Sequence, residues 1–326
     1  MSETAAGPRQ EAQARLDALE PGLYEARVLE PSPPPVTEGP WFADDPVAPL
    51  PRSARTLVSP VSNADLTWDE LARTAPTLQR WCAERWLGAW PALQRIADGD
   101  AFGATRGAWH RLAEHVLAPA RHRATGKIGL RYTRRGFGTP FLDGPDRQLR
   151  VEAAVLVVVG TEERRVPADT LGVAAAAVRL DPQGATGVYE PATPAEPDAP
   201  LPIDVEAAAR LGDWFGFGAS VLEELRAAAP GRDASRVQLW PEHFDLSVDL
   251  GDEGRRGTFG VSPGDDSHPL PYLYVTHWSS VPDDPYWDDP AFGGASLGYA
   301  ALLEAADQRG AALAVFRRGL AVHTRV

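Results

Sequence analysis

The prolines of this chain are concentrated in two stretches, and these stretches limit where a compact fold can form. The chain has 31 prolines among 326 residues. The first stretch lies within residues 1–55, and the second spans Tyr189–Pro202. Because proline lacks a backbone N–H and favours extended backbone, we expect neither stretch to join a helix interior or a sheet. The sequence therefore predicts an extended or disordered arm over 1–55 and one folded domain over 56–326, with 189–202 as the point where that domain could be subdivided.

Helical patterns dominate the region that follows the arm. Apolar residues recur at helix-like intervals near 68–87, 91–98 and 105–122. We expect the third of these helices to stop at Pro119 or soon after, because proline cannot continue a helix interior. Similar reasoning predicts helices later in the chain, at 170–180, 205–229 and 299–318.

Alternation of apolar and polar residues predicts the strands. The predicted strands are 128–132, 151–159, a short one near Val166, 237–240, 244–250, 258–261 and 272–278. Residues 151–159 are apolar on both faces and favour a single central strand, whereas Gly136–Gly138 favours a turn. The predicted fold class is α+β, in which a helical layer packs on a largely antiparallel sheet.

Charge and cysteine content limit the partners and the compartment. The formal net charge of −13 argues against nucleic acid and anionic membranes as partners. No run of eighteen apolar residues is present, and the N-terminal residues lack the apolar core of a secretory signal. The single cysteine, Cys82, excludes an intramolecular disulfide. We expect an acidic cytoplasmic protein with a small-molecule ligand, and the sequence indicates neither an oligomeric state nor a cofactor.

The densest group of reactive side chains lies around residues 242–245 and 266–268. On a strand, His243 and Asp245 would share a face, because alternate residues point the same way. One interpretation makes His243 a general base oriented by Asp245, with Glu242 and His268 in the same catalytic group. A second makes the His-x-Asp pair a metal site completed by His268 or His277. The third is an ordinary polar strand face without chemistry.

One basic segment interrupts this acidic chain, and it suggests a place for an anionic substrate. Arg131, Arg134 and Arg135 lie beside Gly136–Gly138, whose backbone amides could approach an anion. We expect these arginines, together with Asp266, to bind the substrate. The alternative is that the arginines offset acidic surface elsewhere.

Several segments of the chain carry a resemblance to known sequences. They are Trp240–Leu246, Ser262–Asp266, His268–Tyr274 and Phe292–Leu297, and also Ala118–Arg121, Arg123–Gly126 and Pro200–Pro202. These segments resemble those of an uncharacterised actinobacterial protein family. The order of elements is also distantly similar to a broader bacterial domain of unknown function, which matches Phe244–Leu246 and Pro269–Tyr274 but has no counterpart of His243 or His268. The resemblance implies that Asp245 is the element common to both, and it implies no known activity.

These observations lead to two hypotheses from different classes. The first is an enzyme that acts on a small polar or anionic substrate by acid–base chemistry of histidine and carboxylates, with or without a metal. The second is a non-catalytic protein that binds a small ligand or regulates a partner through the same polar groups.

Overall fold

A computed structural model describes most of the chain beyond residue 91. The described residues are 92–133, 136–139, 142, 148–160, 163–182, 184, 187–227, 235, 237–251, 255–278 and 284–324. They form helices and two antiparallel sheets, which confirms the predicted α+β class. The predicted arm over 1–55 and the predicted helix at 68–87 lie outside these ranges.

The first helical segment starts earlier than its apolar pattern predicts. Helix α6 spans Gly99–Leu112 and begins where the Asp98 side chain accepts a hydrogen bond from the Ala101 amide at 2.9 Å. An aspartate in this position satisfies an amide that the first helical turn leaves without a partner. The helix predicted near 91–98 is therefore wrong in its described part, because residues 92–98 form the approach to this cap.

The same segment also continues beyond Pro119. Five residues, Ala113–Leu117, form the π-helical turn η2, and α7 then runs from Ala118 to Thr125. The amide of Ala118 donates to the Ala113 carbonyl five residues back. Pro119 thus sits in the first turn of α7, where a missing N–H costs least, and the wider π turn precedes it. The prediction that the helix stops near Pro119 is wrong for this reason.

A five-stranded meander follows this helical segment. Its strands are β1 Arg131–Thr133, β2 Gly136–Gly138, β3 Gln148–Glu152, β4 Val155–Val159 and β5 Glu163–Pro167, and helix α8, Leu171–Ala177, comes next. The predicted single strand at 151–159 is wrong: Ala153, at φ 49°, and Ala154 turn the chain between β3 and β4. Gly136–Gly138 is a strand rather than a turn, since it pairs with β3. Glycine is needed at position 136 because a side chain there would overlap the Val151 carbonyl of β3.

A second meander completes the chain. Helix α9, Val205–Ala227, precedes β6 Gln238–Trp240, β7 Asp245–Leu250, β8 Gly257–Ser262, β9 Tyr272–His277 and β10 Ala295–Gly298, and helices α10 Tyr299–Glu304 and α11 Gln308–Thr324 follow. The predicted strands match β6 to β9, whereas β10 was not predicted. The predicted final helix is two helices, because the backbone at Ala305 is extended.

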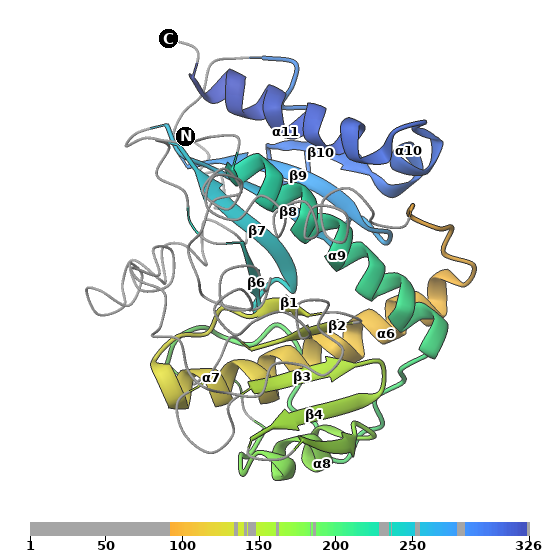
Figure 1. Cartoon of the computed structure of the whole chain (residues 1–326), viewed down its shortest axis with the longest axis vertical. Coiled ribbons are helices and arrows are strands. Elements are labelled where there is room, and N and C mark those ends of the chain that lie inside the picture. The colour runs from red at the N-terminus through yellow and green to blue at the C-terminus, as the bar shows by residue number, and fades with distance from the viewer. Residues whose placement is uncertain are drawn as a thin grey trace, which may run out of the picture.

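The two meanders meet edge to edge. The amide of Leu130 donates to the Leu239 carbonyl at 2.7 Å, and the amide of Leu239 donates to the Leu130 carbonyl at 2.9 Å. The strands therefore follow one another from β4 near the bottom of Figure 1 to β10 near the top. A helix, a five-stranded meander and further helix occur in that order twice, although the sequence shows no internal repeat.

One face of this combined sheet is apolar, and the long helices cover it. Helix α9 contacts β1 and β2 of the first meander as well as β7 and β8 of the second, across which it passes in Figure 1. At the junction, the Phe244 ring packs against Phe137 of β2 and Phe215 of α9 at 5.2 and 5.3 Å between ring centroids. Trp109 of α6 packs on Phe137 at 5.5 Å. The hydrophobic core therefore crosses the boundary between the two meanders.

The opposite face carries polar side chains on both meanders. In the first, Arg150 and Glu152 of β3 pair at 2.8 Å, and Arg165 of β5 pairs with Glu152 at 2.7 Å. In the second, the alternation of β7 places Asp245, Ser247 and Asp249 on this face. The chemistry-bearing residues of the sheet are thus kept apart from its apolar face.

The turn between β3 and β4 yields a test of the fold. Ala153 has a left-handed backbone that favours glycine, whereas Ala154 does not. We expect Ala153→Gly to raise the free energy of unfolding by about 0.5–1 kcal/mol, measured by urea denaturation. The matched variant Ala154→Gly should lower it by about 0.5–1 kcal/mol, and equal effects of the two variants would contradict the assigned turn.

Candidate functional site

Sheet topology brings two of the predicted site segments to the same end of the second meander. Because β6 and β7 are antiparallel and adjacent, the turn at 241–244 lies at the end where β6 stops and β7 starts. Strand β8 stops and β9 starts at that same end, so the loop 263–271 lies there too. Arg106 of α6 also reaches this end, where its guanidinium donates to the Pro269 carbonyl at 3.0 Å.

Asp245 is linked to β9 across the intervening strand. The Tyr274 hydroxyl donates to the Asp245 carboxylate, and Gly260 of β8 lies in register between Tyr274 and Ser247, two residues after Asp245. A side chain at Gly260 would overlap the Tyr274 ring. Glycine is therefore needed at this position, because the tyrosine ring lies across it to reach Asp245.

His268 lies between two carboxylates. Its Nε2 atom is 3.0 Å from Asp289 Oδ2, and its Nδ1 atom is 3.6 Å from Asp265 Oδ1. Asp265 also accepts a hydrogen bond of 2.6 Å from the Tyr272 hydroxyl. The imidazole packs on the Tyr272 ring at 4.4 Å between centroids, and its side chain is 27% exposed. A ring oriented on one side by a carboxylate and still partly open to solvent is a suitable group for moving protons.

The loop between β9 and β10 carries the buried partner of His268. Asp289 has a side-chain exposure of 4%, and its Oδ1 atom accepts from the Ala291 amide at 3.0 Å. Its backbone amide donates to the Gly294 carbonyl at 2.9 Å. The same loop places the Phe292 ring against Tyr272 and Tyr274, at 6.4 and 6.2 Å between centroids. The loop therefore lies against the polar face of β9.

The surroundings of Asp265 and Tyr272 affect their protonation. Burial by itself raises the pKa of Asp265, but the hydrogen bonds from Tyr272, His268 and Ser267 outweigh it and leave that pKa below its ordinary value. Burial, followed by the nearby Asp265 carboxylate, raises the pKa of the Tyr272 hydroxyl. Near neutral pH, Asp265 is therefore negatively charged, while Tyr272 is neutral and donates its proton.

A second group of buried titratable residues lies on the π turn. The Glu114 carboxylate accepts hydrogen bonds of 2.8 Å from the Ala192 and Thr193 amides and one of 2.6 Å from the Thr193 hydroxyl. Burial raises the pKa of Glu114 to about 7 although these three bonds oppose the rise, and the charge of Glu242 adds to it. This carboxylate anchors the proline-rich segment 189–202 to the first helical segment.

His110, one turn earlier, holds the turn between β6 and β7. Its Nε2 atom lies 2.8 Å from the Pro241 carbonyl, and its ring stacks on Phe244 at 5.3 Å between centroids. Burial is the main reason that the pKa of His110 falls to about 3; the hydrogen bond to Pro241 opposes this shift, and the charge of the neighbouring His243 adds to it. The ring is therefore neutral near pH 7, and Nε2 carries the hydrogen that it donates to Pro241. Phe244 itself has a left-handed backbone at φ 52°.

The catalytic residues expected from the sequence divide into two groups. In the first group, Asp245 accepts from the Tyr274 hydroxyl and His268 packs on the Tyr272 ring. The charge of Asp245 also acts on Tyr272, which places the two residues near each other. Glu242 is buried beside Glu114, and His243 is exposed in the turn, so the alternation of β7, which starts at Asp245, does not extend to them.

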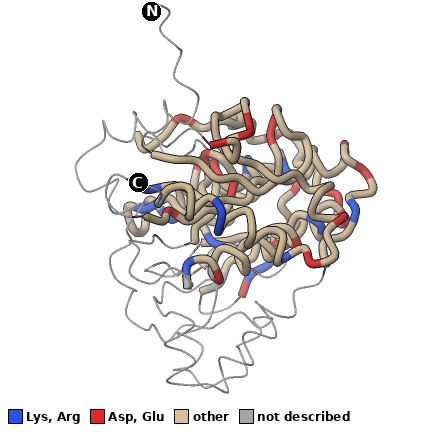
Figure 2. Tube along the Cα trace, turned by 90° about the horizontal axis from the view of Figure 1, so that it is seen from above, with Lys and Arg blue, Asp and Glu red and all other residues tan. Residues whose placement is uncertain are grey.

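The expected substrate-binding residues are not gathered around His268. Arg131 is buried, and its guanidinium donates to the Val237 carbonyl at 3.3 Å, which ties β1 to the second meander. Arg134 and Arg135 lie outside the described residues. Asp266 is exposed in the 263–271 loop, one residue from the Asp265 that contacts His268. Lys and Arg positions lie among Asp and Glu positions along the described trace in Figure 2.

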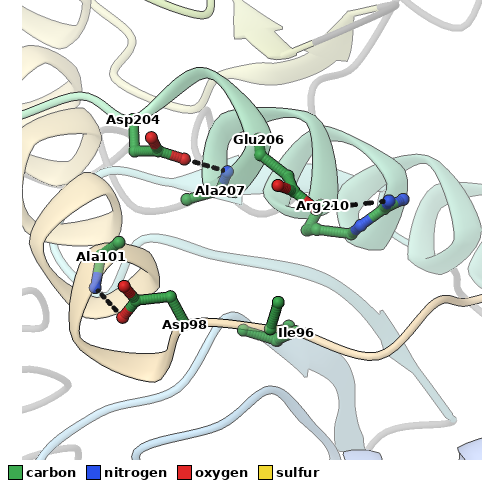
Figure 3. A pocket seen from close by; sticks show the side chains of 8 residues that line it. Ile96, Asp98, Ala101, Asp204, Glu206, Ala207 and Arg210 are labelled. Atoms are coloured by element: carbon green, nitrogen blue, oxygen red, sulfur yellow. Dashed lines mark hydrogen bonds and ion pairs between the residues drawn. The ribbon is translucent and has the colours of Figure 1, made fainter.

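A pocket lies apart from these residues, between the first turns of α6 and α9 (Figure 3). Asp98 and Asp204 occupy its two walls, but each side chain already caps its own helix by accepting from Ala101 and Ala207. Arg210 of α9 also lines the pocket, and its guanidinium pairs with the Asp213 carboxylate of the same helix at 3.3 Å. The pocket volume is about 40 Å³, far below the roughly 300 Å³ of small ligand sites.

Neither a metal cluster nor a membrane span occurs in the part of the chain that the structure describes. Within those ranges, no three His, Cys, Asp or Glu side chains are arranged to hold a metal ion. None of the described helices has the length and apolar character needed to cross a bilayer.

Comparison of the chain with protein-family models, with curated proteins and with solved structures found no match. The site is therefore interpreted from its own geometry.

Several residues at the site were not identified from the sequence. Asp265 and Tyr272 are close in sequence to His268, and a partner search among its neighbours could have found them. Asp289 lies 21 positions further along the chain, and no local pattern connects it to His268. Glu114 is one turn from His110, but only the fold shows that it holds residues 192 and 193.

The opposite pKa shifts of Glu114 and His110 predict a maximum in stability. Because the pKa of Glu114 rises from 4.5 to about 7, the folded state binds more protons than the unfolded state, and stability falls as the pH rises through this window. Because the pKa of His110 falls from 6.5 to about 3, stability rises with pH between those values. We expect a plateau between about pH 4.5 and 6.5, measured by denaturation at fixed ionic strength.

Variants separate the two contributions. In Glu114→Gln the opposing slope is lost, so stability should go on rising across the plateau to about pH 6.5, and the decline above pH 6.5 should disappear; a shift of this size amounts to about 3 kcal/mol. In His110→Gln the rise below about pH 4.5 should disappear and stability should decline between about pH 4.5 and 7. A plateau that persists unchanged in Glu114→Gln would show that another group causes it.

Proposed function

We propose that the chain is an enzyme that performs acid–base chemistry on a small polar molecule, with His268 as the residue that moves the proton. The observation that carries this proposal is the position of the His268 ring between Asp289 and Asp265. Histidine is the side chain whose charge changes most easily near neutral pH, and an adjacent carboxylate fixes its orientation.

Asp289 supports the role of an orienting group. Its carboxylate is buried and held by the Ala291 amide, and it faces Nε2 at 3.0 Å. In the neutral ring, Nε2 therefore carries the hydrogen and donates it to Asp289, which leaves the lone pair on Nδ1. Asp289 is a positioning residue in this scheme, because it acts through His268.

Nδ1 supports the role of the proton acceptor. This atom has no hydrogen-bond partner among the described residues, and the Asp265 oxygen nearest to it is also an acceptor. A hydroxyl or ammonium group of a substrate, placed about 2.8 Å from both atoms, would donate to one of them. When Nδ1 takes the proton, the bond from hydrogen to the substrate heteroatom breaks, an Nδ1–H bond forms, and the resulting imidazolium lies between two carboxylates.

The second candidate is a non-catalytic protein that binds a small ligand at the same place. It is favoured by the burial of Nδ1, which solvent does not reach in the described conformation although the ring as a whole is partly exposed. In this case Asp265, Asp289 and Tyr272 orient the ligand, and no proton is transferred.

A ligand screen on the full chain distinguishes the candidates. Small polar molecules with amine, carboxylate, phosphate or hydroxyl groups are tested by thermal unfolding, since a ligand at about 100 times its Kd stabilises the native state by about 2.7 kcal/mol. Compounds that stabilise the wild type are then followed by NMR for turnover. We expect His268→Gln to lower turnover by about 10²–10⁴-fold, as loss of an acid–base group does.

The control is His122→Gln on α7, which makes the same chemical change outside the proposed site and should leave turnover unchanged. Stabilisation that depends on His268 without turnover would replace the enzyme by the binding protein. Turnover that His268→Gln leaves intact would overturn the assignment of the site.

A further inference from the structure

We propose that the ligand of the His268 site is a small organic cation, such as an amine or a quaternary ammonium compound. This inference rests on the proposed function for the location of the site and adds the chemical class of the ligand. It follows from the carboxylates and aromatic rings that surround His268 and from the way the nearby guanidinium is used.

Three carboxylates come from three different parts of the second meander. Asp245 starts β7, Asp265 follows β8, and Asp289 lies in the loop before β10. The Tyr272 and Tyr274 hydroxyls donate to Asp265 and Asp245, so both carboxylates are oriented hydrogen-bond acceptors. The pKa of Asp265 lies below its ordinary value, so this carboxylate is negatively charged near neutral pH. A cation is the ligand charge that this group of acids favours.

Aromatic rings line the same place. Tyr272 and Tyr274 lie 6.1 Å apart between ring centroids at an angle of 49°, and the Phe292 ring is inclined at 78° to Tyr274. Tyr272 and Tyr274 are buried and Phe292 is partly exposed, so Phe292 is the ring of this group that a ligand would reach from solvent. An organic cation gains from contact with an aromatic face as well as from the carboxylates, and quaternary ammonium groups are bound in this way.

Ser247 gives an independent indication of an absent polar partner. Its residue exposure is 1%, and its hydroxyl has no hydrogen-bond partner among the described side chains and backbone. It lies on the same face of β7 as Asp245 and opposite Gly260, across which the Tyr274 ring lies. A buried hydroxyl without a partner costs free energy, and an N–H or O–H group of a cation such as ethanolamine or choline, placed beside Tyr274, would relieve that cost.

Among the described residues, the positive charge found at this end of the sheet already makes other contacts. The Arg106 guanidinium donates to the Pro269 carbonyl and interacts with the charges of Asp265 and Asp266. The sequence had suggested an anionic substrate held by Arg131, but that guanidinium binds the Val237 carbonyl instead. An anion at His268 would face the Asp265 and Asp289 carboxylates, and the guanidinium described nearby, that of Arg106, already donates to Pro269.

The test uses the purified full chain and three sets of probes at matched ionic strength. The cations are choline, tetramethylammonium and ethanolamine, the anions are acetate and inorganic phosphate, and the neutral probe is glycerol. Thermal unfolding and calorimetric titration measure binding. We expect the cations to raise the melting temperature of the wild type and the anions and glycerol to leave it unchanged.

Two variants and one control identify the groups responsible. Phe292→Leu keeps an apolar side chain but removes a π face, and Asp265→Asn removes one charge; each should weaken cation binding by roughly tenfold. Glu304→Gln removes one negative charge at an exposed helix end and should change the affinity by less than about twofold. If Asp265→Asn fails to fold, Phe292→Leu alone decides the aromatic contribution.

The outcomes separate this inference from the function on which it rests. Stabilisation by anions or by glycerol that is lost in His268→Gln overturns the cationic class and leaves the proposed site in place. Cation binding that is equal in Phe292→Leu and the wild type, or that Glu304→Gln weakens as much as Asp265→Asn, overturns the inference. If no probe and no screened compound gives stabilisation that depends on His268, both the inference and the proposed function are wrong.

Discussion

The rest of the structure depends on burying one apolar face that runs across both meanders. Helix α9 covers this face by contacting β1 and β2 on one side of the junction and β7 and β8 on the other. The Phe244 ring closes the junction between Phe137 and Phe215, and its left-handed backbone lets β7 start immediately afterwards with Asp245 on the opposite face. Core packing therefore fixes the position of the first site residue.

This division of the sheet explains why polar chemistry is confined to one face and one end. Asp245 alternates with the core residues of β7 and accepts a hydrogen bond from Tyr274 on the polar face, while the loop that carries Asp289 contacts His268. The contacts of these polar residues come from strands and loops that are brought together only when the whole second meander has formed. A single hairpin would supply Asp245 but neither of the carboxylates beside His268.

The sequence predicted β6 to β9 well, because alternation along a strand is local and one face of each strand is apolar. The hairpin at 148–159 was mistaken for one strand because its turn consists of Ala153 and Ala154, which carry no turn preference. Asp245 and His268 were identified from local clusters of reactive residues. Their partners were not, since Asp289 and Tyr274 become neighbours only through sheet register and loop packing. The contact of Glu114 with Thr193 likewise depends on the π turn at Ala113–Leu117, which the sequence pattern did not predict.

The Leu130–Leu239 pairing has a mechanical consequence. Two backbone hydrogen bonds join the meanders at this point, which is a narrow joint for two sheets of five strands each. Alone this junction would act as a hinge. Helix α9 packs on strands at both sides of the junction and so limits bending there. Bending the joint would require α9 side chains to slide over Phe137 or Phe244. The stiffness that holds the β8–β9 loop and its carboxylates in place therefore comes in part from the other half of the molecule.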